Sequence, residues 1–232
     1  MTRLRSLALA ALISIAAGCL SNREYRNIYS LDGAADVPSQ AGAVTKRPVM
    51  QLERVLIPDY LDATDIQLRV GAHEIHESAT GRFGERLSLG ITHALRSDLA
   101  SRLPAYTIAL AQSVYSPARR ILVNVDAFDV WPSGRCVLVA DWTIVDEDRR
   151  TKLSADRGTF TTVATGVNPG DGAIVTAMAD AVRQLADRIA STAEALPPRT
   201  SPSTLSEYSG PHAGSIAGIV KASAKGMKNP DR

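Results

Sequence analysis

Apolar and polar residues alternate along two neighbouring stretches of this chain, residues 121–130 and 136–145. A two-residue period places successive side chains on opposite faces of a strand, so each stretch is expected to bury one face. The intervening Pro132-Ser133-Gly134 is typical of a turn and predicts an antiparallel hairpin. Residues 159–165, rich in β-branched side chains, would add a third strand. The sequence therefore predicts a β-meander.

Two segments show a helical period instead. Leucine and isoleucine recur every four residues from Leu87 to Leu103, and Pro104 ends this predicted helix. A second helix is expected from Asp171, which can cap it, to about Leu196. Shorter strands are expected at residues 49–57, 66–72 and 106–111. The predicted fold is α+β: two strands and a helix (ββα), the meander, then a helix, with two amphipathic helices on one mixed or antiparallel sheet.

The N-terminus has the pattern of an export signal. Arg3 and Arg5 precede an apolar run of 11 residues, Leu7 to Ala17, which is shorter than the ~20 residues of a membrane-spanning helix. The run leads into Ala16-Ala17-Gly18-Cys19, which resembles the bacterial lipobox. We therefore expect cleavage between Gly18 and Cys19 and a covalent lipid on Cys19, with no other cofactor. An ordinary signal peptide with an incidental cysteine is the alternative.

Several acyl chains anchor a protein stably to a membrane, where a single chain is marginal. The residue after Cys19 is Leu20, and not the Asp that retains many lipoproteins at the inner membrane. By resemblance to lipoproteins generally, the expected location is the periplasmic face of the outer membrane. Retention at the inner membrane stays an alternative.

The chain divides into four predicted regions. Residues 1–18 form the signal peptide, and residues 19–47 form the lipidated N-terminus and a tether. The Gly33–Arg47 part of this tether would let the anchored domain extend away from the membrane. Residues 48–197 form the α+β domain. Residues 198–232 are rich in Ser, Gly and Pro and are expected to be a disordered tail.

The charge balance and the two cysteines limit what this chain can bind and how its fold can be stabilised. Removing residues 1–18 leaves 24 basic and 24 acidic residues, so the neutral mature chain gives no electrostatic case for nucleic-acid binding. With Cys19 acylated, Cys136 has no partner for a disulfide within the chain. Cys136 lies in an apolar run, which indicates a small buried residue; a reactive thiol is the alternative.

No catalytic or metal site is predicted. His73 and His76 are three residues apart near a strand end and would point to opposite faces, unlike the helical pair of a zinc protease. No Gly-x-Ser-x-Gly motif is present. His93 is interpreted as a partly exposed helix residue, and Asp126 and Asp141 as solvated acids. A turn is predicted at Gly81-Arg82-Phe83-Gly84, before the first helix.

Several segments, taken in order, resemble the ABC-type transport auxiliary lipoproteins, the family that includes paraquat-inducible protein C (PqiC). The most specific is the Pro-x-Tyr-Leu-Asp segment followed by an aliphatic-Arg strand. The matching segments are Tyr29-Ser30-Leu31, Ile57-Pro58-Asp59-Tyr60-Leu61-Asp62, Ile66-Gln67-Leu68-Arg69, Arg82-Phe83-Gly84-Glu85-Arg86-Leu87, Leu138-Val139-Ala140-Asp141-Trp142, Leu185-Ala186 and Ile189-Ala190.

The resemblance implies a role without catalysis. Such lipoproteins are partners of transporters with an MCE-domain subunit, which move lipids or other hydrophobic molecules across the envelope and support its integrity. ATP hydrolysis would belong to another subunit. Some members form rings, so a homo-oligomer is among the expected partners.

Asp59, Tyr60, Asp62 and Arg69 are the candidate residues for docking this partner, because exposed loop residues after a strand often carry function. Turn chemistry is the competing interpretation of the first three. A different role is a structural envelope lipoprotein whose tail, with formal charge +3, binds peptidoglycan or anionic lipid. A periplasmic hydrolase is a weaker alternative.

Overall fold

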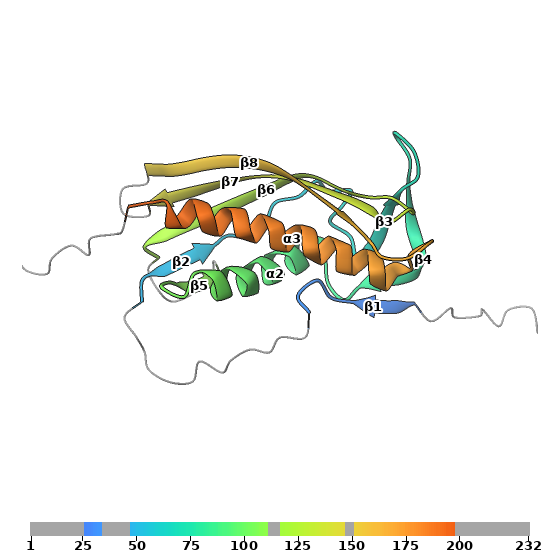
Figure 1. Cartoon of the computed structure of the whole chain (residues 1–232), viewed down its shortest axis with the longest axis horizontal. Helices are drawn as coiled ribbons and strands as arrows, with labels where there is room; N and C mark the ends of the chain where they lie inside the picture. The colour runs from blue at the N-terminus through green and yellow to red at the C-terminus, as the bar shows by residue number, and fades with distance from the viewer. Residues whose placement is uncertain (1–25, 34–46, 111–116, 147–150, 198–232) are drawn as a thin grey trace, which may run out of the picture. The chain divides into compact units, whose positions relative to one another are not determined.

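The computed structural model describes residues 26–33, 47–110, 117–146 and 151–197. Within them the chain forms eight strands and two helices in the order shown in Figure 1. The elements are β1 (Asn27–Tyr29), β2 (Val49–Leu52), β3 (Asp65–Arg69), β4 (Ile75–Phe83), α2 (Leu87–Arg102), β5 (Thr107–Leu110), β6 (Arg119–Val130), β7 (Arg135–Asp146), β8 (Thr151–Val163) and α3 (Asp171–Glu194). The predicted α+β class is confirmed.

The larger sheet has five strands in the order β5-β2-β6-β7-β8. The predicted hairpin is present: β6 and β7 are antiparallel, with Val123 opposite Trp142, and β8 continues the meander on the far side of β7. The short strand β2 runs parallel to both β5 and β6. Parallel neighbours need a crossover connection, and α2 lies in the connection from β2 to β5.

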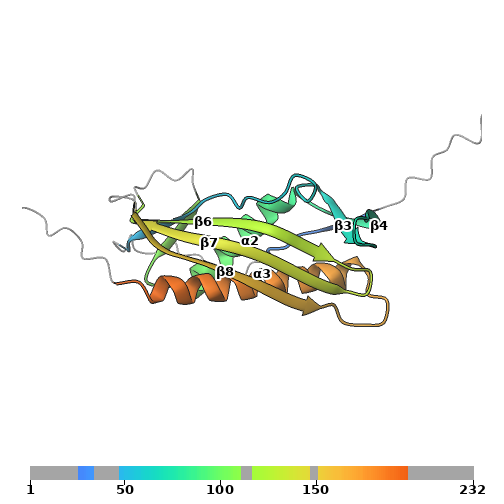
Figure 2. The same ribbon diagram turned by 90° about the horizontal axis from the view of Figure 1, so that it is seen from above.

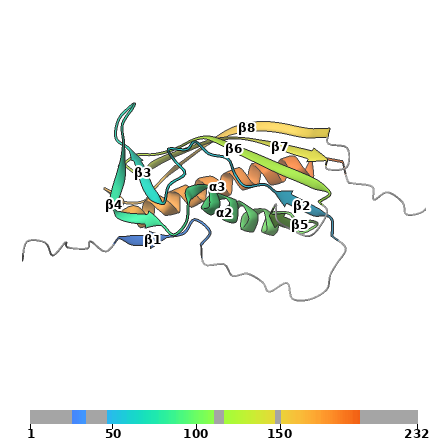
Figure 3. The ribbon, with the colours of Figure 1, turned by 180° about the vertical axis from the view of Figure 1, so that it is seen from behind.

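Both helices cover one face of this sheet, and its other face carries no described helix (Figure 2). The helices lie side by side, as Figures 1 and 3 show from opposite sides. The core lies between the helices and the sheet. Its largest fully buried side chains are Trp142, Phe128, Met50, Leu52, Ile66, Ile91, Leu95, Leu99, Ile121, Leu138, Ile144 and Leu185. Burial of such side chains stabilises a fold by roughly 1.5–3 kcal/mol each.

A second, three-stranded sheet was not predicted, and it corrects the expectation of a single sheet. Its order is β1-β4-β3, with β3 and β4 antiparallel and β1 parallel to β4. The predicted turn at residues 81–84 is wrong, because Gly81, Arg82 and Phe83 are strand residues. The inward positions of β4 include Ser78 and Gly81, so the strand lacks the apolar alternation that identifies strands in a sequence.

The segment before residue 48 also differs from the prediction. β1 pairs with β4, and the Leu31 side chain is 5% exposed within the core. Residues before position 48 therefore contribute to the fold. Of the predicted tether Gly33–Arg47, residues 34–46 lie outside the described residues. The predicted cap of the last helix also differs from the structure. Asp171 is the first residue of α3, and the N-cap residue is Gly170, which makes no side-chain hydrogen bond.

The Asp171 carboxylate instead joins α3 to the small sheet. Ser78 Oγ donates to both of its oxygens, at 2.8 and 2.9 Å, and Thr80 Oγ1 donates to one of them at 2.5 Å. A carboxylate at a helix N-terminus also interacts favourably with the helix dipole. Asp171 is buried, so these hydrogen bonds replace the water that it loses on folding.

Candidate functional site

The loop between β2 and β3 carries three of the four candidate docking residues. Pro58 opens a tight turn in which its carbonyl oxygen accepts a hydrogen bond of 2.9 Å from Leu61 N–H. Leu61 is buried and fixes the turn to the core, whereas Asp59 and Tyr60 project outward. Tyr60 keeps 48% of its surface exposed. Both side chains are exposed and can contact a partner.

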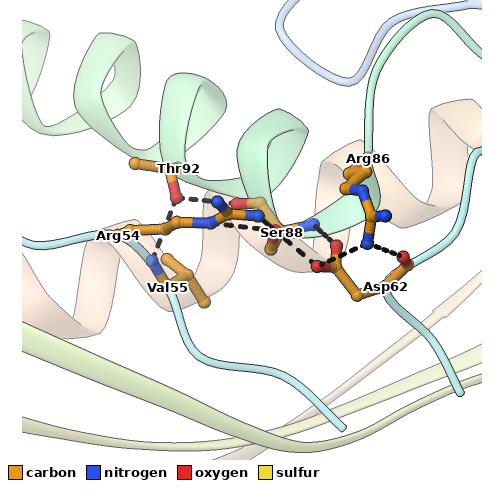
Figure 4. Close-up of polar contacts among 6 residues, drawn as sticks. All are labelled: Arg54, Val55, Asp62, Arg86, Ser88 and Thr92. Atoms are coloured by element: carbon orange, nitrogen blue, oxygen red, sulfur yellow. Dashed lines mark hydrogen bonds and ion pairs between the residues drawn. The ribbon is translucent and has the colours of Figure 1, made fainter. Parts of the chain in front are cut away.

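Asp62, in contrast, contacts other residues of the domain and has a structural role. Its Oδ1 accepts a hydrogen bond of 3.2 Å from the backbone N–H of Ser88, in the first turn of α2 (Figure 4). Arg54 Nη2 lies 3.4 Å and Arg86 Nη1 lies 3.6 Å from Oδ2. The N-cap residue of α2, Arg86, makes no side-chain capping bond, so the Asp62 carboxylate occupies the role of a cap from a distant loop.

Two opposing effects act on the pKa of Asp62. Burial raises it, but the hydrogen bonds from Ser88 and the charges of Arg54 and Arg86 together outweigh burial. The pKa is therefore below the ordinary value for an aspartate. The ionised form is the one that holds the start of α2.

Four residues that the sequence did not indicate, Arg54, Val55, Ser88 and Thr92, complete this network. Arg54 Nη2 donates to Ser88 Oγ at 2.6 Å (Figure 4). Thr92 Oγ1 accepts from Val55 N–H at 3.0 Å and donates to the Ser88 carbonyl oxygen at 2.7 Å. The Arg54–Ser88 and Val55–Thr92 contacts join residues 34 and 37 positions apart, so no local pattern in the sequence could have indicated them.

Arg69 ties the two sheets together. Its Nε donates to Asp129 Oδ1 on β6 at 2.6 Å, and its Nη1 donates to the Ala72 carbonyl oxygen at 3.1 Å. The hydrogen bond to Asp129 is the main reason that the pKa of Arg69 is raised, and Tyr60 contributes further. The structure thus brings Tyr60 and Arg69 close to each other, while Asp62 faces α2.

Other polar side chains, among them several singled out in the sequence, have structural partners. Ser88 Oγ accepts a hydrogen bond of 2.6 Å from the Arg54 guanidinium. His93 Nδ1 lies 3.0 Å from Glu85 Oε1, and Asp126 forms an ion pair of 2.5 Å with Arg157. His73 lies in the turn before β4, with His76 on that strand. Among the described residues, no group of three or more His, Cys, Asp or Glu could hold a metal ion.

Cys136 is fully buried, as predicted, and burial raises the pKa of its thiol to about 12. The predicted lipidation residue Cys19 and its neighbour Gly18 lie outside the described residues. Within the part of the chain that is described, no helix is long and apolar enough to cross a membrane.

The described elements form an α+β domain in which two helices cover one face of a five-stranded sheet. Residues 29–190 match the family of ABC-type transport auxiliary lipoprotein components, and the chain belongs to that family. The match runs from the last residue of β1 to residue 190 within α3, and it confirms the family indicated by the sequence motifs.

Two solved structures share the fold. A crystal structure of an uncharacterized protein is 18% identical with a TM-score of 0.61, covering 73% of this chain and 99% of that one. The crystal structure of protein XCC0632 from Xanthomonas campestris is 9% identical with a TM-score of 0.53, covering 62% and 83%. Identities this low show the fold alone. No curated protein matches the sequence.

Proposed function

We propose that this protein is a lipid-anchored accessory subunit of an ABC transport system with an MCE-domain subunit. It docks the transport conduit at the periplasmic face of the outer membrane and thereby supports envelope integrity. The family match over residues 29–190 is the observation that carries the proposal. The cargo class is a lipid or another hydrophobic molecule.

The anchor is Cys19, and the short connection between anchor and domain supports a docking role. Arg26 Nη2 donates to the carbonyl oxygens of Ser78 and Gly81, at 2.6 and 2.9 Å. Arg26 Nη1 also lies 2.7 Å from Asp65 Oδ1. Arg26, which contacts β4 and Asp65, is thus seven residues after the anchor, and this short stretch of chain keeps the domain close to its membrane.

The outward side of the β2–β3 loop is the candidate docking surface, formed by Leu56, Asp59 and Tyr60. Leu56 is 65% exposed and Tyr60 is 48% exposed. Aromatic residues are enriched at the centres of protein interfaces, where they supply area at a small entropic cost. The Asp62 and Arg69 contacts fix the loop from behind, so its binding groups are preorganised.

Co-purification tests this proposal. The mature lipoprotein is extracted from its native envelope in mild detergent, and the accompanying proteins are identified by mass spectrometry. Recovery of an MCE-domain protein with its permease and ATPase is the expected result. Recovery of the acylated lipoprotein alone would overturn the transport role while keeping the anchor.

The docking surface has its own variant and control. The double substitution Asp59→Ala and Tyr60→Ala should reduce recovery of the MCE-domain protein at least about tenfold, since hot-spot residues commonly contribute about 2 kcal/mol or more. Gln184→Ala, on the exposed side of α3, is the matched control and should leave recovery unchanged. Equal recovery with both variants would exclude the loop as the docking surface.

A further inference from the structure

One end of the domain collects the start of β1, the start of α3, the β6–β7 turn and the loop between β8 and α3 (residues 164–170). Figures 1 and 2 show this grouping from two directions. Hydrogen bonds confirm this grouping. The Ser78 carbonyl oxygen accepts a hydrogen bond from Arg26, and the Ser78 hydroxyl donates one to Asp171. The Ala164 N–H donates to the Gly134 carbonyl oxygen at 2.9 Å. We call this the anchor-side end.

The anchor-side end displays aliphatic side chains to solvent. Val167 is 95% exposed at the tip of the β8–α3 loop, and Val163 at the end of β8 is 66% exposed. On the adjacent β6–β7 turn, Trp131 is half-buried and the Arg135 guanidinium lies 4.9 Å from the centre of its ring. A single exposed valine needs no explanation, but two of them beside a tryptophan and an arginine form a distinct surface.

The backbone builds this display. Gly166 has a φ of +103° and Asn168 a φ of 55°, so both residues flanking Val167 adopt the left-handed region. Gly134 has a φ of +84°, and a Cβ added there would lie 2.7 Å from Pro169 and 2.8 Å from Ala164. The turn and the loop therefore pack closely on each other, and Val167 is held outward by a defined conformation.

Chain length relates this end to the anchor. Cys19 precedes Arg26 by seven residues, which can span at most about 25 Å. A lipid on Cys19 therefore keeps the bilayer surface within about 25 Å of Arg26. Arg26 lies at the anchor-side end, so this end of the domain is within reach of the membrane surface.

We propose that the anchor-side end rests on the bilayer, with Val167 and Val163 entering the headgroup region. Trp131 then lies at headgroup depth, where tryptophan is enriched, and Arg135 faces the lipid phosphates. This inference rests on the proposed lipidation of Cys19. It gives the anchored domain one orientation, in which the end of α3 near Glu194 points away from the membrane.

A bilayer fits this surface better than a folded partner. Two valines and one half-buried tryptophan offer far less area than the roughly 800 Å² per partner of a stable protein interface. An interfacial contact next to a covalent anchor needs no such area, because the lipid supplies the binding and the loop only sets the orientation. The test separates the two occupants.

The experiment places a water-sensitive fluorophore on Val167→Cys in the full mature chain, lipidated on Cys19. Labelling is selective, because Cys136 is buried and Cys19 is acylated in that protein. The matched control is Ser191→Cys, exposed near the far end of α3 and about 30 Å along that helix from Asp171. Each protein is reconstituted into vesicles of phosphatidylethanolamine and phosphatidylglycerol, with or without a lipid that carries a quencher on its acyl chain.

The fluorophore at position 167 should shift to shorter wavelength on reconstitution and be quenched at least about twofold more than that at position 191. Failure of the chain to float with vesicles would contradict the lipidation itself. If the protein floats with the vesicles but the fluorophores at positions 167 and 191 show the same emission wavelength and quenching, only this inference would be overturned. Shielding that arises solely after the transporter subunits are added would assign the end to a protein partner, and also overturn it.

Discussion

The Asp62 carboxylate caps α2 by accepting a hydrogen bond of 3.2 Å from the backbone N–H of Ser88, 26 residues later in the chain. One side chain of the β2–β3 loop thereby fixes the start of the helix behind it. The exposed residues Asp59 and Tyr60 belong to the same loop, so the stability of α2 and the position of the candidate docking surface depend on a shared contact.

Substitution Asp62→Asn should therefore lower the free energy of unfolding by about 1 kcal/mol at pH 7, because the amide keeps the shape but loses the charge. The pKa of Asp62 is lowered in the folded protein, so its contribution is present above the unfolded pKa of about 3.9 and is lost as pH falls through the folded pKa. Urea denaturation at several pH values measures the difference between the two proteins, which should shrink below about pH 4.

Asp59→Asn is the control for that experiment. Asp59 is exposed in the same turn, and its substitution should change stability by less than about 0.5 kcal/mol at every pH. A constant difference between the wild-type protein and Asp62→Asn down to pH 3 would mean that the charge of Asp62 does not stabilise α2.

The ion pair between Arg69 and Asp129 should couple the two sheets energetically. Both side chains are about four-fifths buried, so their charge-assisted hydrogen bond is partly shielded from water. A double-mutant cycle with Arg69→Ala and Asp129→Ala is expected to give a coupling of about 1–2 kcal/mol in the free energy of unfolding. The exposed pair Arg183 and Asp180 on α3 is the comparison, with less than about 0.5 kcal/mol expected. Equal couplings would contradict a structural role for Arg69.

Gly81→Ala should destabilise the domain by about 2 kcal/mol. A Cβ at this position would lie 2.6 Å from Asp171 Oδ2 and 2.8 Å from Tyr29 Cε2, so the Asp171 carboxylate and the Tyr29 ring must move away from their positions against β4. Gly33→Ala is the control, because nothing lies within 4 Å of its added Cβ. Thermal unfolding of both variants measures the difference. A melting temperature unchanged by Gly81→Ala would show that the close approach of the three elements is not required.

Cys136 should resist thiol reagents in the folded protein. Burial raises the pKa of its thiol to about 12, so about one molecule in ten thousand carries a thiolate at pH 8. An aromatic disulfide reagent is expected to modify Cys136 only in denaturant, whereas the cysteine of Val167→Cys reacts within seconds to minutes in buffer. Rapid modification of Cys136 in the native state would mean that β7 opens readily to solvent.

Hydrophobic periodicity in the sequence predicted some strands and helices and missed others. The alternation along β6 and β7 and the four-residue period of α2 predicted those elements closely, because each buries one continuous apolar face. β4 escaped prediction since its inward positions meet the Asp171 carboxylate and the Tyr29 ring through Ser78 and Gly81. A strand that packs through small and polar residues has no apolar signature.

The candidate docking residues show the same division. The sequence indicated Asp59, Tyr60 and Asp62 together as candidate docking residues, because they lie in a loop after a strand. The tertiary structure separates its members, because Asp62 turns toward Ser88 while Asp59 and Tyr60 face outward.

The sequence by itself determined the α+β class, the family and the main elements, since these follow from hydrophobic periodicity and from motifs that are local in the chain. Only the tertiary structure decided how β1 joins the small sheet, how Asp62 caps α2 and how Arg69 joins the two sheets. Each of these contacts links residues tens of positions apart. Their geometry depends on how the hydrophobic core sets the elements against one another, and no short stretch of sequence records that.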